Sequence, residues 1–219
     1  RNVEIDTIVL NAGLQYTGDI KPRWSTQKYE LTFAVNHLGH QYLCEGILPI
    51  LLKSRIPRIV VTASEVHNPE APGGKFGKPA GLGELRGLII GEGHSMIDGL
   101  SEFDADKAYK DSKLCNILFA KELSSRLDSQ GWKIPIIAWA PGLVIPRTQG
   151  GFFRYSRKYN RIGQLIFAAV VRDLLRITET PVNAGKLLMQ IATENKYEKV
   201  GFTYFSNKVV APGKRIFEE

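Results

Sequence analysis

The stretch that decides the fold is residues 6–13, DTIVLNAG. Its short apolar run is typical of a parallel strand that is buried on both faces, and Asn11, Ala12 and Gly13 end it. Further runs of this kind occupy residues 58–64 (RIVVTAS), 132–140 (WKIPIIAWA) and 201–205 (GFTYF). Helical patterns cover about residues 26–52, 106–127 and 180–193. Strands that alternate with helices predict an α/β, doubly wound, Rossmann-like sheet of parallel strands.

The length and composition predict one soluble globular domain over residues 1–219. No apolar run reaches the 18 or so residues of a membrane span, and the strand-like opening does not predict a signal peptide. Cys44 and Cys115 are too few for a disulfide framework and lack metal-ligand spacing, so we expect a reducing compartment and no metal site.

The net charge is +7, from 29 basic and 22 acidic residues. This excess allows nucleic acid, an anionic membrane surface or an acidic substrate as partner. The basic residues are scattered over most of the chain and form no nucleic-acid motif, so we do not expect nucleic-acid binding.

Residues 66–103 are rich in Gly and Pro and lack sustained periodicity, which predicts a long excursion from the core. Within them, residues 81–87 (GLGELRG) imitate a phosphate-binding loop. They follow no predicted strand and open no convincing helix, so we reject that interpretation.

Three of the predicted strands end in residues suited to a ligand site. They are Asn11-Ala12-Gly13, Ser64 and Pro141-Gly142. Ligands of doubly wound sheets bind at the carboxyl ends of the strands, where glycine lets backbone approach closely. Taken one at a time, each is better explained as an ordinary turn glycine or strand-end serine. Asn36, within the apolar helix sequence VNHLGH, is a buried amide that needs a partner.

Tyr109 and Lys113 lie one helical turn apart in YKDSK. The pair is either part of a solvated helix face or a proton donor with its electrostatic activator, because an ammonium group lowers a phenol pKa. Asn116 falls on the same stripe of the helix, whereas Cys115 points away and is expected to be a packing thiol.

The motifs NAG, VNHLG, VVTAS, YKDSK and PG, in this order, resemble the short-chain dehydrogenase/reductase family over nearly the whole chain. The resemblance implies a catalytic tetrad of Asn36, Ser64, Tyr109 and Lys113. Tyr109 would transfer the proton, Ser64 would hold the substrate oxygen, and Lys113 would lower the tyrosine pKa and bind the nicotinamide ribose. Asn36 would fix a proton-relay water.

The same resemblance implies a nicotinamide cofactor, with NADPH preferred and NADH left open. The residues expected to bind it are Asn11, Ala12, Gly13, Tyr109, Lys113, Pro141, Gly142, Val144 and Thr148. The family cradles the cofactor phosphates in a Gly-rich turn after its first strand, and no such segment precedes Asn11. We therefore expect the chain to begin at the family's fourth strand, without the N-terminal strands and the Gly-rich loop.

The long separation between Ser64 and Tyr109 is similar to that in the retinol dehydrogenase-like and light-dependent protochlorophyllide oxidoreductase branches. Residues 95–123 look most like the second branch, but Leu143 stands where its members carry a cysteine. The expected function is that of an NAD(P)(H)-dependent oxidoreductase acting on a lipophilic carbonyl, alcohol or conjugated double bond. Light-dependent protochlorophyllide reduction and a non-catalytic binding or assembly subunit are the alternatives.

Residues 147–176, which form the substrate cap in this family, mix basic residues and aromatics with the apolar run LIFAAVV. The composition suits a surface helix on anionic lipid, or a pocket lid whose arginines face water. We expect a cytoplasmic protein or a plastid protein associated with thylakoids. If the cap is a surface helix on anionic lipid, we also expect peripheral membrane contact. The oligomeric state stays open.

Overall fold

The computed structural model describes residues 4–91, 93–145 and 161–219. In these residues the chain forms one five-stranded sheet in the order β1-β2-β3-β4-β5. The first four strands are parallel, and β5 runs antiparallel to β4. The strands are β1 (Thr7–Leu10), β2 (Arg58–Thr62), β3 (Pro135–Ala140), β4 (Gly201–Ala211) and β5 (Lys214–Glu218). The predicted Rossmann-like α/β class is confirmed.

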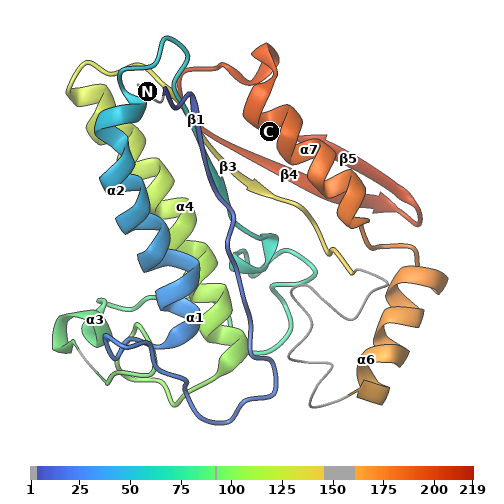
Figure 1. Ribbon diagram of the computed structural model, residues 1–219. Helices are drawn as coiled ribbons and strands as arrows, with labels where there is room; N and C mark the ends of the chain where they lie inside the picture. The colour runs from blue at the N-terminus through green and yellow to red at the C-terminus, as the bar shows by residue number, and fades with distance from the viewer. Residues whose placement is uncertain (1–3, 92, 146–160) are drawn as a thin grey trace.

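Helices cover both faces of this sheet (Figure 1). On one face lie α4 (Ala105–Ser129) and a continuous helix made of α1 (Leu31–Phe33), the π-helical turn η1 (Ala34–Leu38) and α2 (Gly39–Leu51). On the other face lies α7 (Pro181–Thr193). The remaining helical segments are η2 (Glu65–His67), α3 (Arg86–Ile90), α6 (Arg161–Ala168), η3 (Ala169–Leu174) and η4 (Asn195–Tyr197).

Strands β2 and β3 are buried along their whole length, and their sequences are almost entirely apolar because both faces of the sheet are covered there. Ile59 and Val61 of β2 pack toward α2 and α4, in a cluster that includes Cys44 and Leu127. Val60, between them, packs on the opposite face in a cluster with Ile191 of α7. Alternate residues of one strand thus serve two hydrophobic cores, which fixes the register of the sheet.

The largest differences from the predicted element boundaries are at the first long helix and at β4. The first long helix begins at Leu31 and not near residue 26, because the Glu30 carboxylate caps it by accepting the N–H groups of Thr32 and Phe33. Strand β4 continues to Ala211, and β5 was not predicted as a strand. The charged and half-exposed sequence of β5 lacks the apolar signal of a central strand, as an edge strand does.

The excursion at residues 66–103 is packed and not merely a surface loop. Its Ile97 lies in a buried cluster with Phe33 and Cys115. Three glycines make its close turns: a Cβ added to Gly74, Gly87 or Gly99 would lie within 3 Å of backbone atoms. The segment GLGELRG follows no strand and opens only the five-residue helix α3, so it is not a phosphate loop.

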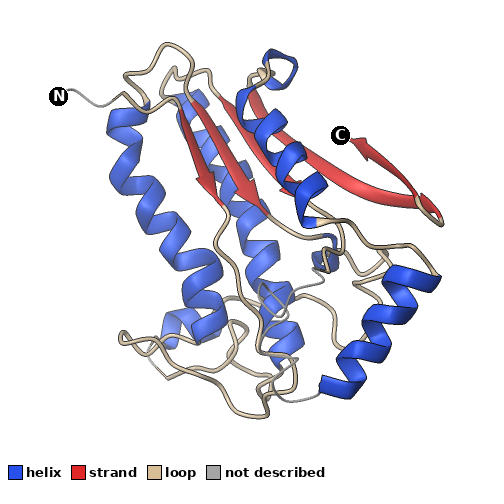
Figure 2. Ribbon diagram, turned by 45° about the vertical axis from the view of Figure 1, so that its right-hand side comes forward, coloured by secondary structure: helices blue, strands red, loops and turns tan. Residues whose placement is uncertain are grey.

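The parallel strands run toward the side of the molecule at which α6 lies (Figure 2). None of the helices in the described residues has both the length and the apolar character needed to cross a bilayer. Within the same residues, no group of three or more His, Cys, Asp or Glu side chains is arranged to hold a metal ion.

Candidate functional site

Helix α4 and the end of β2 bring Tyr109 and Ser64 together. The Asp104 side chain caps α4 through the N–H groups of Asp106 and Lys107, so the first turns of the helix, including Tyr109, are held firmly. Tyr109 is half-buried and its hydroxyl is hydrogen-bonded to Ser64. Burial raises the pKa of Tyr109 to about 12, against the lowering effect of the Ser64 hydrogen bond. The phenol is therefore protonated at neutral pH.

Lys113 lies one turn further along α4 and is almost fully buried. Its Nζ donates to the Thr62 carbonyl over 3.0 Å and lies 5.6 Å from the centroid of the Tyr109 ring. Burial lowers the pKa of Lys113 to about 8. The sequence-based expectation was that Lys113 depresses the tyrosine pKa. In this structure burial raises that pKa and the Ser64 hydrogen bond opposes the rise, and the role of Lys113 stays a prediction.

Asn36 sits in the π-helical turn η1 with no exposed surface. Its Oδ1 accepts the Leu14 N–H over 2.8 Å, and its Nδ2 donates to the Leu14 carbonyl and to Ser112 Oγ, each over 3.0 Å. The buried amide has the partners it was expected to need. It links the segment after Gly13 to α4, and both of its N–H donors are used in doing so.

The residues that follow β1 lie beside this cluster. Asn11, Ala12 and Gly13 are exposed, and a Cβ added to Gly13 would lie 3.6 Å from Lys113 Nζ and 3.8 Å from Asn36 Oδ1. Asn11 Oδ1 accepts from the Thr62 hydroxyl over 2.8 Å. The absent side chain of Gly13 leaves space directly over the lysine and the asparagine, as a closely approaching ligand requires.

The Pro141-Gly142 turn after β3 is held by residues of β4 and β5, near the C-terminus. Gly142 has φ +79°, and a Cβ there would lie 2.4 Å from Arg215 Nη1, so this position requires glycine. Asn207 Nδ2 donates to the Pro141 carbonyl over 3.0 Å, and Val144 forms a bridge with Glu179. Thr148 lies outside the described residues.

Sequence reasoning missed several residues that build the site. The Thr62 carbonyl accepts from both Lys113 Nζ and Asn116 Nδ2, which confirms that the lysine and Asn116 share one face of α4. A main-chain acceptor carries no sequence signal. Arg215, Asn207 and Glu179 were missed because they lie in segments without a motif, and only the folded sheet brings them to the Pro-Gly turn.

Cys115 lies in the buried cluster with Phe33 and Ile97, away from the site, where burial raises the pKa of its thiol to about 12. A buried thiol with so high a pKa is a poor nucleophile at neutral pH. The structure thus agrees with its expected packing role.

Comparison with known proteins supports the resemblance seen in the motifs. No family model matches the chain. It is 33% identical over 210 residues to protochlorophyllide reductase A, chloroplastic, of Oryza sativa subsp. japonica, covering 93% of this chain and 52% of that protein. It is 32% identical to the protochlorophyllide reductase of Avena sativa, covering 93% of this chain and 65% of that protein. The chain therefore matches only part of the length of these relatives.

Solved structures share the fold. A short-chain dehydrogenase/reductase of unknown function from Caenorhabditis elegans has a TM-score of 0.59 at 17% identity, over 92% of this chain and 63% of that one. The 3-alpha-hydroxysteroid dehydrogenase of Pseudomonas sp. B-0831, complexed with NADH, has a TM-score of 0.59 at 19% identity, over 92% and 72%. The chain is thus similar in sequence to protochlorophyllide reductases, and it has the fold of the short-chain dehydrogenase/reductase structures.

Proposed function

We propose that the chain provides the catalytic part of an NADPH-dependent reductase that acts on a lipophilic carbonyl or conjugated double bond, or on the alcohol in the reverse direction. The observation that carries this proposal is the Tyr109–Ser64 hydrogen bond, with buried Lys113 one helical turn away. A protonated tyrosine beside a hydroxyl that can hold an oxygen is the arrangement that proton donation to a substrate requires.

The residues present fit a nicotinamide cofactor. Gly13 lacks the Cβ that would fill the space over Lys113 and Asn36, and the Lys113 ammonium keeps donors beyond the one used by Thr62. In our proposal Lys113 holds the ribose, while Asn11, Ala12, Gly13, Pro141, Gly142, Val144 and Thr148 hold the remainder. When bound, the cofactor supplies the hydride.

The chain's own residues would do the rest of the work. Ser64 orients the substrate oxygen, and Tyr109 donates its phenolic proton to the substrate. Lys113 stabilises the phenolate that forms, because a positive charge nearby favours the ionised tyrosine. Asn36 holds the loop after Gly13 against α4, which keeps the cofactor side of the site in place.

A second candidate is light-dependent protochlorophyllide reduction, which the names of the relatives favour. We rank it second because Leu143 follows Pro141-Gly142 where that branch carries a cysteine. Leu143 packs against the buried cluster of Ile145, Ala168 and Val171 and offers no thiol. A non-catalytic binding subunit ranks third, because the four tetrad residues are all present.

One experiment separates these functions. The full-length protein is incubated with NADPH and a panel of lipophilic carbonyls in the dark, and with protochlorophyllide and NADPH under illumination. We expect NADPH oxidation in the dark and no chlorophyllide in the light. Light-triggered product would make the second candidate the function, and binding of NADPH without turnover in either case would favour the third.

The relatives named chloroplastic favour a plastid, thylakoid-associated location over the cytoplasm. We also propose that the cap contacts an anionic membrane surface, so that a lipophilic substrate can enter without crossing water.

A further inference from the structure

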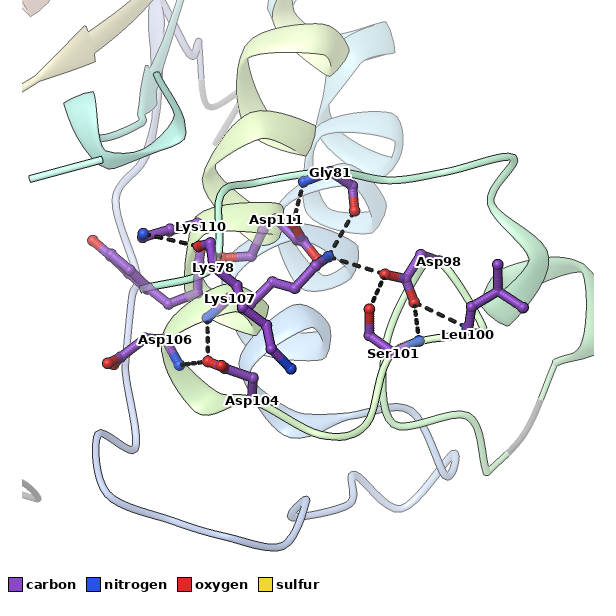
Figure 3. A network of polar contacts seen from close by, with 12 residues as sticks. Lys78, Gly81, Asp98, Leu100, Ser101, Asp104, Asp106, Lys107, Lys110 and Asp111 are labelled. Atoms are coloured by element: carbon purple, nitrogen blue, oxygen red, sulfur yellow. Dashed lines mark hydrogen bonds and ion pairs between the residues drawn. The ribbon is translucent and has the colours of Figure 1, made fainter. Parts of the chain in front are cut away.

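The second and third residues of YKDSK, Lys110 and Asp111, contact the excursion and not the proposed site. Both are buried, as are Lys107 on the preceding turn of α4 and Asp98 of the excursion (Figure 3). Two lysines and two aspartates thus bury no net charge between α4 and the excursion. Buried charges are tolerated only where their partners are well placed, so we infer that this contact is a specific part of the fold.

The Lys110 ammonium is held entirely by main-chain carbonyls of the excursion. Its Nζ donates to the carbonyls of Gly74 (3.1 Å), Lys78 (3.0 Å) and Phe76. These three acceptors match the three N–H donors of an ammonium group. Lys110 therefore gathers residues 74–78 around one point on α4, immediately after Tyr109.

Lys107 holds the later part of the excursion, through two carboxylates and one main-chain carbonyl. Its Nζ lies 2.6 Å from Asp111 Oδ2 and 3.2 Å from Asp98 Oδ2, and donates to the Gly81 carbonyl over 2.7 Å. Asp111 Oδ1 in turn accepts the Gly81 N–H over 2.8 Å. Although burial raises the pKa of Asp98, hydrogen bonds from Ser101, Leu100 and Lys107 hold it well below its usual range, so the carboxylate stays charged.

The segment that Lys110 holds is the direct continuation of the strand end that carries Ser64. After Ser64 the chain makes the turn η2, and a Cβ added to Gly74 would lie 1.8 Å from the Asn68 carbonyl oxygen. Residues 64–78 thus form a folded loop, which leaves β2 at Ser64 and is fastened to α4 at Lys110. Tyr109 directly precedes Lys110, and Ser64 lies at the start of the loop that Lys110 holds.

We propose that Lys110 is a positioning residue of the reaction: it fastens residues 64–78 to α4 so that Ser64 is held against the hydroxyl of Tyr109. Lys107, Asp111 and Asp98 hold the second half of the excursion for the same purpose. This inference rests on the proposed function, because it assigns Lys110 a role in that site.

The test compares the full-length protein with Lys110→Met, which keeps the length of the side chain and removes the ammonium. Lys110→Arg is the milder variant, since it keeps the charge and some donors. Lys75→Met is the matched control, because Lys75 is an exposed lysine of the same loop. Amide exchange at residues 74–78 and the ¹³Cζ resonance of Tyr109 at pH 7 are measured first, and neither needs a substrate.

In Lys110→Met we expect amide exchange at residues 74–78 to be at least about tenfold faster and the Tyr109 resonance to shift, with smaller changes in Lys110→Arg and none in Lys75→Met. With a carbonyl that the wild type reduces, kcat should fall roughly 10- to 100-fold while the dissociation constant of NADPH stays within about twofold.

Two results would overturn the inference. One is a folded Lys110→Met protein with wild-type exchange and an unshifted Tyr109 resonance. The other is faster exchange over the whole domain with the Tyr109 resonance unshifted, which would make Lys110 a residue of stability alone. Failure of the proposed function would be seen separately, as a wild-type protein that oxidises no NADPH.

Discussion

Tyr109 combines a half-buried ring with a hydroxyl that is hydrogen-bonded to Ser64, so its chemistry and its packing can be separated by one substitution. Tyr109→Phe keeps the ring and removes the proton. We expect kcat to fall roughly 10²- to 10⁴-fold in the NADPH oxidation assay, with little change in melting temperature. Tyr42→Phe, at a position 82% exposed on α2, is the control. Near-normal turnover of Tyr109→Phe would remove the tyrosine from the mechanism.

Lys113 makes a prediction about pH and stability. Burial lowers its pKa from 10.5 in an unfolded chain to about 8, so between these values the unfolded state binds more protons than the folded one. The free energy of unfolding therefore gains a contribution that rises with pH above about 8, and is lost as pH falls through 8. Lys113→Met should lack it.

The measurement is urea unfolding of both proteins at pH 7 and pH 9. Higher pH values are avoided because burial raises the pKa values of Cys44 and Cys115. Their contributions to the free energy of unfolding therefore fall as pH rises above about 9. We expect the difference in free energy of unfolding between wild type and Lys113→Met to change by roughly 1 kcal/mol from pH 7 to pH 9, which is the free energy of about one pKa unit. A pH-independent difference would mean that Lys113 is not a buried ammonium.

Glycines of different elements should respond differently to substitution. Gly46 in α2 has open space where a Cβ would be, so Gly46→Ala should raise the free energy of unfolding by about 0.5–1 kcal/mol through helix propensity. Gly74→Ala would place a Cβ 1.8 Å from the Asn68 carbonyl oxygen and should lower the free energy of unfolding. Chemical unfolding of both variants checks whether the free energy of unfolding rises in the first and falls in the second. A tolerated Gly74→Ala would show that the loop after Ser64 is not tightly folded.

At the scale of elements, the sequence predicted what local patterns specify. The apolar runs of β1, β2 and β3 and the periodicity of α2, α4 and α7 are local signals, and they led to the right elements within a few residues. The packing of the excursion was not predictable in this way. It depends on Lys107 and Lys110 finding carbonyls 26 to 36 residues earlier in the chain, and a lysine in a helix ordinarily indicates a solvated face.

At the scale of the molecule, the position of the candidate site follows from topology, because parallel strands bring Gly13, Ser64 and Gly142 to the same end of the sheet. Topology did not predict the residues that hold the candidate site residues in place. The Thr62 carbonyl accepts from Lys113, and Asn207 and Arg215 come from a strand pair with no motif. The roles of the tetrad residues, Asn36 included, remain predictions that turnover measurements must test.

Helix α6 and the turn η3 expose apolar side chains next to basic ones. Ile162, Leu165, Ile166 and Leu174 are each at least 61% exposed there. The exposed Arg161 and Arg176 flank them, and the whole chain carries a net charge of +7. Exposed apolar residues beside arginines are what a helix lying on anionic lipid presents. The alternative is that this segment only covers the substrate pocket.

Co-sedimentation with liposomes separates these two cases. We expect the full-length protein to bind anionic vesicles at low salt and to bind neutral vesicles weakly, because each basic residue near the surface contributes about 1 kcal/mol. High salt should release it, since screening shortens the reach of these charges. Arg161→Gln with Arg176→Gln should weaken binding, and Leu165→Ser with Ile166→Ser should weaken it at any salt. Ile20→Ser, at an exposed apolar position before α1, is the control. If the wild-type protein stays in the supernatant at low salt, α6 and η3 act as a lid over the substrate and the lipophilic substrate must reach the site through water.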